Sequence, residues 1–144
     1  MLTLKPSDLE TLLIAVIQAR QNLLVTSSPG IGKTAIFKRA IKAVNAFGYF
    51  FYVSIGDPTD FKGIPWIVDG KGKFIAFDEL QKVYEAIDAG EKVVVVFDDL
   101  GQGMPAMQAA GMSLMDKLRG KCSIIAATNR RGDKAGVQGV LEPV

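Results

Sequence analysis

The sequence predicts an α/β fold with a mostly parallel central sheet, and three observations lead to this prediction. Short apolar runs alternate with helix-compatible stretches, which is the order of elements in a parallel α/β sheet. The run Lys92–Phe97 (KVVVVF) is continuously apolar after its lysine, as in a central strand that is buried on both faces. A hydrophobic content of 49% and a mean hydropathy of +0.23 fit a sheet that is covered on both sides. At 144 residues the chain has the size of one domain, which we assign to residues 1–144.

The first third of the chain is predicted to form two helices and two strands. Ser7 or Asp8 can cap the first helix, whose apolar residues recur on one face. Gly48 is a natural end for the second helix, and the aromatic residues after it favour a strand. We expect Asp57–Asp60 to break that strand. In chain order, the expected elements are helix Asp8–Arg20, strand Leu23–Thr26, helix Lys33–Phe47 and strand Tyr49–Ile55.

The remaining elements begin with a predicted hairpin. Turn-forming residues at Asp69–Gly72 separate two short strand-like segments, Ile64–Val68 and Lys73–Ala76. A helix should then end at Gly90, and Pro105 suits the first turn of a later helix. The expected order is helix Glu79–Ala89, strand Lys92–Phe97, helix Pro105–Leu118 and strand Cys122–Ala127, with an irregular chain from Thr128 onward.

Composition excludes several classes of protein. Histidine is absent, so neither a histidine metal site nor a histidine base is available. The single cysteine, Cys122, lies in an apolar run, which predicts burial and fits a reducing, cytoplasmic location. A net charge of +2, with no run of like charges, gives no indication of nucleic acid or a membrane surface as partner. No apolar stretch reaches the roughly 18 residues that a membrane span needs, and Asp8 and Glu10 replace the basic start of a signal peptide.

The segment Ser27–Thr34 (SSPGIGKT) predicts a phosphate-binding loop between a strand and a helix. Gly30 and Gly32 let backbone N–H groups turn inward around phosphate oxygens. Lys33 can reach the β- and γ-phosphates, and the hydroxyl of Thr34 can hold Mg²⁺. The usual spacing G-x-x-x-x-G-K-[ST] would have glycine at position 27, so Ser27 departs from it, and we expect some backbone strain there. The residues predicted to bind nucleotide are Ser28, Pro29, Gly30, Ile31, Gly32, Lys33, Thr34 and Asp98.

Two carboxylates follow the valine-rich strand, at the edge where an open α/β sheet places ligand-binding groups. Asp98 suits the Walker B role of holding Mg²⁺ together with Thr34. Asp99 has the position of the carboxylate that polarises the attacking water. Glutamate is common there, and the shorter aspartate would lie about 1.5 Å further from that water, which predicts slower hydrolysis. Two solvated turn carboxylates are the alternative interpretation.

Polar residues also follow the last predicted strand. The amide of Asn129 can donate to the γ-phosphate or orient the water without competing for Mg²⁺. A simple turn residue is the alternative for Asn129. Arg130 and Arg131 come next, and we expect no direct catalytic role for them. The predicted catalytic residues are therefore Lys33, Asp99 and Asn129.

With these motifs in this order, the chain resembles the AAA+ ATPases, and within them the MoxR-like branch. The similarity to that branch rests on Asp57–Gly63, on the hairpin around Asp69–Gly72 as an insertion in the second helix, on Pro105–Ala110, and on Asn129–Asp133 with the segments after it. The resemblance covers nearly the whole chain from Leu23. It implies a P-loop NTPase three-layer sandwich with ATP and Mg²⁺ as cofactors. It also implies a ring oligomer, usually a hexamer, in which a neighbour's arginine completes each site. Leu100–Gln102 departs from the branch's usual Ile-Asn-Arg, so the intersubunit contacts expected there are not carried over.

The resemblance further implies that residues 1–144 form the amino-terminal part of the ATPase core, without the lid domain. We therefore expect weak nucleotide binding and poor hydrolysis from this chain alone. The absence of the Asn-Lys-x-Asp guanine motif favours ATP over GTP.

Three functions compete at this point. The first is a Mg²⁺-dependent ATPase, chaperone-like, that remodels an unidentified client protein. The second is a nucleotide-binding switch or scaffold with little turnover, which Ser27 and Asp99 favour. The third is a DNA-directed replication helper or helicase loader, against which the near-neutral charge argues.

The hairpin has two interpretations. Trp66, Ile67 and Phe74 either form a mobile apolar element that pushes on a client, or Trp66 packs beneath the hairpin as local core.

Overall fold

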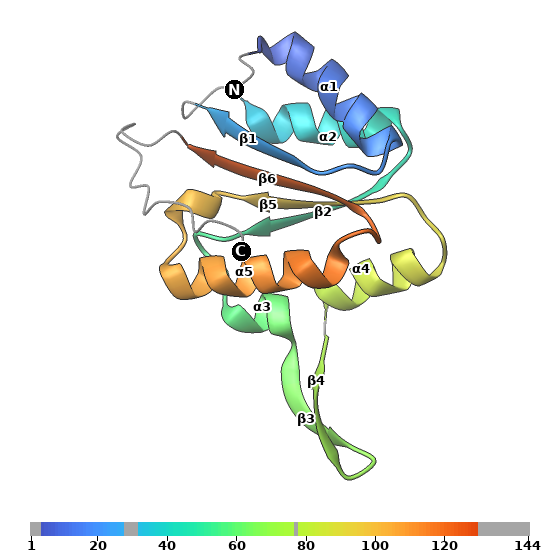
Figure 1. Ribbon diagram of the computed structural model, residues 1–144, viewed down its shortest axis with the longest axis vertical. Coiled ribbons are helices and arrows are strands. Elements are labelled where there is room, and N and C mark those ends of the chain that lie inside the picture. Colours follow the sequence, from blue (N-terminus) through green and yellow to red (C-terminus); the bar gives the residue numbers. More distant parts are fainter. Residues whose placement is uncertain (1–3, 28–31, 77, 130–144) are drawn as a thin grey trace.

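The protein is a three-layer α/β/α sandwich with a separate hairpin, as Figure 1 shows. The computed structural model describes residues 4–27, 32–76 and 78–129. The central sheet has the strand order β1-β6-β5-β2, and all three neighbouring pairs are parallel. The predicted fold class is therefore confirmed.

The elements follow the predicted alternation of helices and strands. Their bounds are α1 Pro6–Gln18, β1 Leu23–Ser27, α2 Lys33–Ala43, β2 Phe47–Tyr52, α3 Pro58–Lys62, β3 Ile64–Val68, β4 Lys71–Ile75, α4 Glu79–Asp88, β5 Val93–Asp98, the 3-10 helix η1 Leu100–Gln102, α5 Pro105–Leu118 and β6 Ser123–Asn129. Within the described ranges, no helix is both long enough and apolar enough to cross a membrane.

Two hydrophobic cores lie on opposite faces of the sheet. The first is formed with α1 and α2, and the second with α3, α4 and α5 (Figure 1). Strand β5 supplies both cores, because successive side chains of a strand point to opposite faces. Val94 and Val96 lie in the first core, whereas Val93, Val95 and Phe97 lie in the second. All six residues of β5 are buried, which explains its continuously apolar sequence.

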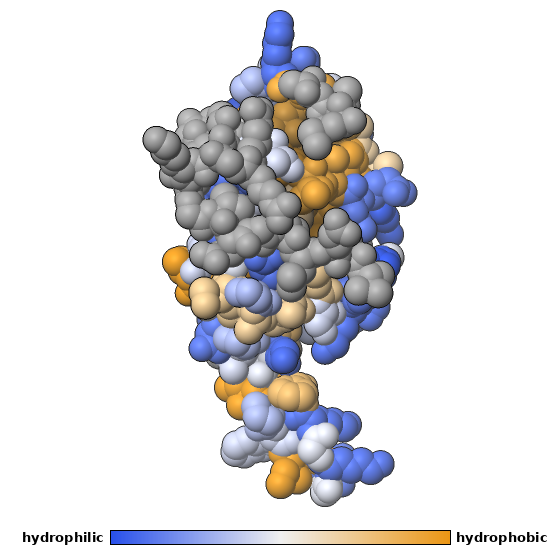
Figure 2. Space-filling view, turned by 60° about the vertical axis from the view of Figure 1, so that its left-hand side comes forward, coloured by the Kyte–Doolittle hydropathy of each residue, from blue (hydrophilic) through white to orange (hydrophobic). Residues whose placement is uncertain are grey.

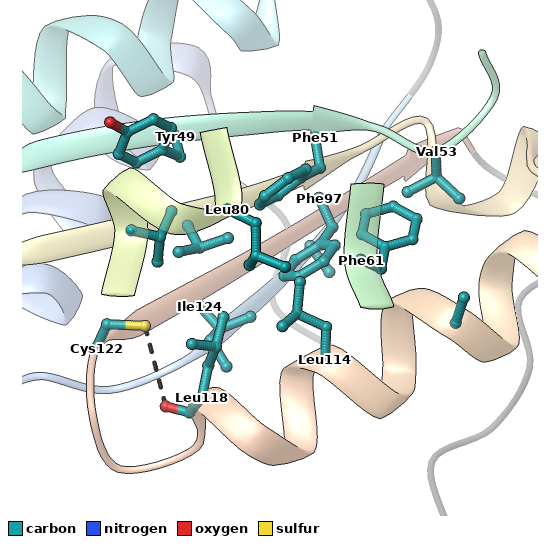
Figure 3. Close-up of a cluster of buried hydrophobic side chains, with 14 of the residues drawn as sticks. Tyr49, Phe51, Val53, Phe61, Leu80, Phe97, Leu114, Leu118, Cys122 and Ile124 are labelled. Atoms are coloured by element: carbon teal, nitrogen blue, oxygen red, sulfur yellow. Dashed lines mark hydrogen bonds between the residues drawn. The ribbon is translucent and has the colours of Figure 1, made fainter. Parts of the chain in front are cut away.

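Aromatic rings fill the second core beside the carboxyl end of β5 (Figure 3). The ring of Phe97 is stacked on that of Phe51, with centroids 5.6 Å apart, and lies 5.9 Å from that of Phe61. Cys122 is buried in the same core, as predicted, and its Sγ donates to the Leu118 carbonyl at 3.9 Å. These contacts hold β5, and so the residues that follow it, in a fixed position.

Several predicted element boundaries were wrong, each for a local reason. Helix α1 begins at Pro6 after Lys5, so neither Ser7 nor Asp8 is its cap. Helix α2 ends at Ala43 rather than at Phe47, because Asn45 adopts a left-handed conformation with φ 54°. Strand β2 therefore starts earlier than predicted. Strand β6 extends through Asn129, two residues beyond its predicted end, because its pairing with β1 continues that far.

The segment predicted as a strand break is a short helix, α3. Asp57 caps it by accepting from the N–H of Thr59 at 3.0 Å, and the N–H of Asp57 in turn donates to Asp60 Oδ2 at 2.9 Å. Gly63 ends the helix with φ 84°, and a Cβ there would lie 2.3 Å from the Ile75 carbonyl oxygen. Glycine at this position thus lets both strands of the hairpin leave the body at one point.

The hairpin projects from the body of the molecule, as Figures 1 and 2 show. Its turn has two residues, Asp69 and Gly70, both with positive φ, and is shorter than the predicted four. The side chains of Trp66, Ile67 and Phe74 are 67%, 72% and 63% exposed. Trp66 therefore does not pack as local core, and an apolar hairpin with no core of its own stands in solvent.

Candidate functional site

The predicted site residues gather at one edge of the sheet. The strands β1, β5 and β6 are parallel, so their carboxyl ends meet there, and Ser27 of β1 pairs with Asn129 of β6. Helix α2 begins at this same edge with Lys33 and Thr34. This arrangement brings together residues from positions 33 to 129, as expected for an open α/β sheet.

Of the predicted phosphate loop, Ser27 and Gly32–Thr34 lie within the described residues. Gly32 is left-handed, with φ 78° and ψ 31°, and a Cβ built there would meet nothing within 4 Å. Glycine is favoured at such a φ, and the space in front of it is open. Ser27 ends β1 and is absent from the positive-φ residues, so the strain expected there is not found. Ser28, Pro29, Gly30 and Ile31 lie outside the described residues.

The ammonium of Lys33 is held across the end of β6. Its Nζ donates to the Thr128 carbonyl and to Asn129 Oδ1, each at 3.3 Å. Both acceptors are neutral, and both distances are long for such bonds. A phosphate would offer charged acceptors instead, which form stronger bonds with an ammonium. The amide N–H₂ of Asn129 is the group that this residue can still offer to a ligand.

Thr34 and Asp98 face each other at hydrogen-bonding distance. The hydroxyl of Thr34 donates to Asp98 Oδ2 at 3.2 Å, and the N–H of Asp99 donates to Asp98 Oδ1 at 2.8 Å. Asp98 is 5% exposed, so both of its carboxylate oxygens are fixed in a largely dry environment. The predicted pairing of Thr34 with Asp98 is therefore present.

Asp99 lies next to Asp98 but is directed differently. It adopts a left-handed conformation, with φ 53° and ψ 36°, and begins the turn into η1. Burial raises the pKa of Asp99, and the nearby Asp98 raises it further, while the hydrogen bond from Ser54 and the charge of Lys33 lower it. A carboxylate with a raised pKa is a stronger base than an ordinary one, which suits activation of a water molecule.

Ser54 is a site residue that sequence reasoning missed. Its hydroxyl donates to Asp99 Oδ2 at 3.3 Å, from the turn after β2. The N–H of Val53 donates to the Asp98 carbonyl at 3.0 Å, which aligns this turn with the end of β5. The sequence carried little signal for Ser54, because it falls inside the predicted strand Tyr49–Ile55, whereas the observed strand ends two residues before it, at Tyr52.

Thr128 connects the end of β6 to the segment after Asp99. Its hydroxyl oxygen accepts from the N–H of Gly101 at 3.0 Å, and the hydroxyl donates to the Asn129 carbonyl at 3.4 Å. Thr128 and Asn129 are both buried, at 4% and 7% exposed. Asn129 is thus a positioned side chain in a strand rather than a simple turn residue. Arg130 and Arg131 lie outside the described residues.

The donor set fits Mg²⁺ with a bound polyphosphate better than Mg²⁺ alone. In the described segments, no group of three or more His, Cys, Asp or Glu side chains could hold a metal. Thr34 and Asp98 offer two hard oxygen ligands 3.2 Å apart. Mg²⁺ is commonly bound by one or two protein oxygens, with phosphate oxygens and waters completing its shell. Thr34 and Asp98 would hold the ion, and Lys33 and the N–H groups near Gly32 would bind the phosphates.

The sequence matches no protein-family model and no curated protein. The structure is similar to that of an ATPase candidate from Cytophaga hutchinsonii, with a TM-score of 0.57 and 17% identity over 94% of this chain. It is also similar to NtrX from Brucella abortus, with a TM-score of 0.55 and 16% identity over 90% of this chain. RuvB of Thermotoga maritima, a Holliday junction branch migration motor, matches with a TM-score of 0.48 and 13% identity over 91% of this chain. The chain spans 41%, 31% and 40% of the lengths of these three structures.

The first two similarities, together with the strand order, establish a P-loop NTPase-like α/β fold. At 17% and 16% identity, these two similarities show the fold alone.

Proposed function

We propose that this chain is an ATP-binding module of the AAA+ type that hydrolyses ATP with Mg²⁺. The observation that carries the proposal is the convergence of Lys33, Thr34, Asp98 and Asn129 at one sheet edge, in front of a left-handed Gly32. Each of these groups has the chemistry that a triphosphate with its metal ion requires. The similarity in fold to ATPase structures is consistent with this assignment.

The roles of the residues follow from their contacts. Lys33 would exchange its two neutral acceptors for phosphate oxygens and so neutralise charge on the β- and γ-phosphates. Thr34 and Asp98 would hold Mg²⁺, which would offset the negative charge that develops during transfer. Asn129 would donate its amide N–H to the γ-phosphate or to the attacking water.

Asp99 is the proposed base for hydrolysis. In the present geometry Asp99 Oδ2 accepts from the Ser54 hydroxyl, and the carboxylate keeps further lone pairs that could accept from a water molecule. As an aspartate it has one methylene less than glutamate, which predicts modest turnover. Asp99→Glu should therefore keep or raise the rate of phosphate release. An Asp99→Glu variant with normal binding and no turnover would exclude this role.

The hairpin supports the MoxR-like assignment and the proposed action on a protein partner. Exposed apolar side chains can mark an interaction site, and here Trp66 is exposed on one face of the hairpin while Ile67 and Phe74 are exposed on the other. We propose that they contact the client that the ATPase remodels, within a homo-oligomeric ring. Trp66 is the only tryptophan, so its fluorescence should report solvent exposure in the free protein and a shift to shorter wavelength when a partner binds.

Calorimetric titration of ATP with Mg²⁺, followed by measurement of phosphate release, tests the proposal. We expect saturable binding by the wild-type chain, and binding without release by Asp99→Asn, because that variant keeps Lys33, Thr34 and Asp98. Absence of binding by the wild-type chain would contradict the site. Because this chain alone is expected to hydrolyse slowly, the rates of the two proteins are compared, and a release rate for the wild type no higher than that of Asp99→Asn would favour the nucleotide-binding switch. DNA-stimulated release that is lost in salt would favour the replication helper.

A further inference from the structure

Among the described residues, no strand pairs with the outer edge of β2. β2 is the last strand in the sheet order and pairs only with β5 in the described chain. The N–H of Phe47 donates to the carbonyl of Lys92, just before β5, and that of Val53 donates to the carbonyl of Asp98, the last residue of β5. Backbone groups of a strand alternate in direction, so those of Gly48 and Phe50 point away from β5. This edge is a ready template for another strand.

A groove lies beside this edge, on the face of the sheet that α2 covers. It has a volume of about 550 Å³ and is lined by Lys38, Ile41, Lys42, Asn45, Ala46, Gly48 and Phe50. Gly48 keeps it open, because a Cβ there would lie 3.0 Å from Ile41 Cδ1 and Cγ2. Side chains of an added strand would therefore find space on the α2 side.

The charges on the two faces of β2 differ in sign. In the groove, Lys38 Nζ lies 5.6 Å from the centroid of the Phe50 ring, and Lys42 is the second cation. No acidic side chain is among the groove residues. On the other face, helix α4 packs against β2 and carries Glu79 and Glu85. Burial raises the pKa of Tyr49, and the charges of Glu79, Glu85 and Glu91 raise it further, as expected for acids on this side. Lys82 pairs with Glu79 at 3.5 Å, so part of this negative charge is balanced.

This charge pattern disfavours pairing of the β2 edge with the β2 edge of a second copy of the chain. Two copies that joined their β2 edges in antiparallel fashion about a two-fold axis would keep equivalent faces on the same side. Lys38 and Lys42 of both copies would then lie on one side, and the acids of both copies on the other. Both juxtapositions are repulsive. A strand with the opposite charge pattern would be attracted on both faces.

We propose that the edge of β2 binds an extended segment of a partner protein, with acidic residues at every second position. Backbone hydrogen bonds to Gly48 and Phe50 would supply affinity, and alternate side chains would supply specificity. The acidic side chains would enter the groove toward Lys38 and Lys42, and neutral or basic side chains would face α4. The site is distinct from the nucleotide site and does not depend on it.

A fluorescein-labelled heptapeptide that alternates Glu with Val is the probe, measured by fluorescence anisotropy with the full chain. We expect saturable binding with a dissociation constant below about 1 mM. Replacement of both Lys38 and Lys42 by alanine should weaken binding by about 4-fold to 25-fold, at 2-fold to 5-fold for each exposed pair. Lys117→Ala, an exposed lysine on α5, is the matched control and should bind as the wild type.

Three further measurements make the proposal falsifiable. A peptide that is N-methylated at alternate residues loses the donors that β2 needs and should not bind, and neither should a peptide that alternates Lys with Val. Lys33→Ala should bind the Glu peptide normally, which separates this site from the nucleotide site. Failure of the Glu peptide to bind, equal binding by the methylated peptide, or insensitivity to loss of both lysines would overturn the proposal. A wild-type dimer in sedimentation that dissociates on Gly48→Ala would overturn it as well, since the occupant would then be a second copy.

Discussion

Replacement of Lys33 by alanine is the sharpest test of the nucleotide site. In the free protein the side chain makes two bonds of 3.3 Å to neutral acceptors, Thr128 and Asn129. Such bonds contribute about 0.5–1.5 kcal/mol each, and the length and partial exposure of these two place them at the low end. The free energy of unfolding should therefore fall by about 1 kcal/mol, or roughly 3 °C in melting temperature.

The loss in nucleotide affinity should be larger. An ammonium that makes two bonds to phosphate oxygens gains about 1.5–3 kcal/mol from each, because the acceptors are charged. Lys33 gives up its two neutral bonds, worth about 1 kcal/mol, when it binds phosphate, so the lower net gain is about 2 kcal/mol, which corresponds to a loss of affinity of about 30-fold. Calorimetric titration of ATP and Mg²⁺ measures this loss, and thermal unfolding without nucleotide measures the structural cost separately.

Lys42→Ala is the matched control, because Lys42 lies on the same helix and is remote from the sheet edge that holds the site. It should leave ATP affinity unchanged. If Lys33→Ala binds ATP as tightly as the wild type while melting at the expected lower temperature, the reasoning is refuted, since the side chain would then stabilise the fold without contacting phosphate.

Three other outcomes follow from the site and the core. Asp99→Asn should stabilise the ligand-free protein at pH 7, because the pKa of Asp99 is raised in the folded state and the wild type therefore loses stability as pH rises through that interval. The difference in unfolding free energy should vanish at about pH 3.5, below the ordinary aspartate pKa. Urea unfolding at both pH values measures this difference, and an equal difference at the two pH values would contradict the prediction. Ser54→Ala removes the hydrogen bond that lowers the pKa of Asp99, so the acid limb of the pH profile for phosphate release should move to higher pH, and an unmoved limb would dissociate Ser54 from the base. Burial raises the pKa of Cys122 to about 11, so Ellman's reagent should react slowly with the native protein at pH 8 and fully in denaturant, whereas a rapid native reaction would show that the thiol is accessible.

The sequence predicted the layers of this fold well because burial on two faces leaves a strong pattern. Strand β5 could be recognised from its unbroken valines, and α5 was predicted with its observed ends at Pro105 and Leu118. Boundaries failed where backbone conformation overrides side-chain pattern. The left-handed Asn45 ends α2, and no periodicity in Lys33–Phe47 distinguishes that residue from a helical one.

Most residues of the candidate site could be predicted from the sequence, but only some of the contacts between them could. Lys33, Thr34, Asp98 and Asn129 were expected at one sheet edge, and parallel strands bring them there. The contact between Ser54 and Asp99 depends on how β2 and β5 end relative to each other, which is a matter of register across the sheet. The hairpin was predicted as an element, but its exposure could not be read from composition, since Trp66 suits a core equally well.

Both strands of the hairpin leave the body close together, at Gly63 and Ile75, so a tilt at this base would move the tip of the hairpin most. Five residue pairs correspond to an arm of about 17 Å, so a tilt of about 10° at the base would displace the tip by about 3 Å. The base is continuous with α3, and α3 packs against α5, whose start follows the turn after Asp99. A small shift of the turn after Asp99 could therefore pass through α5 and α3 to the base of the hairpin, and the displacement would be larger at the tip than at the base.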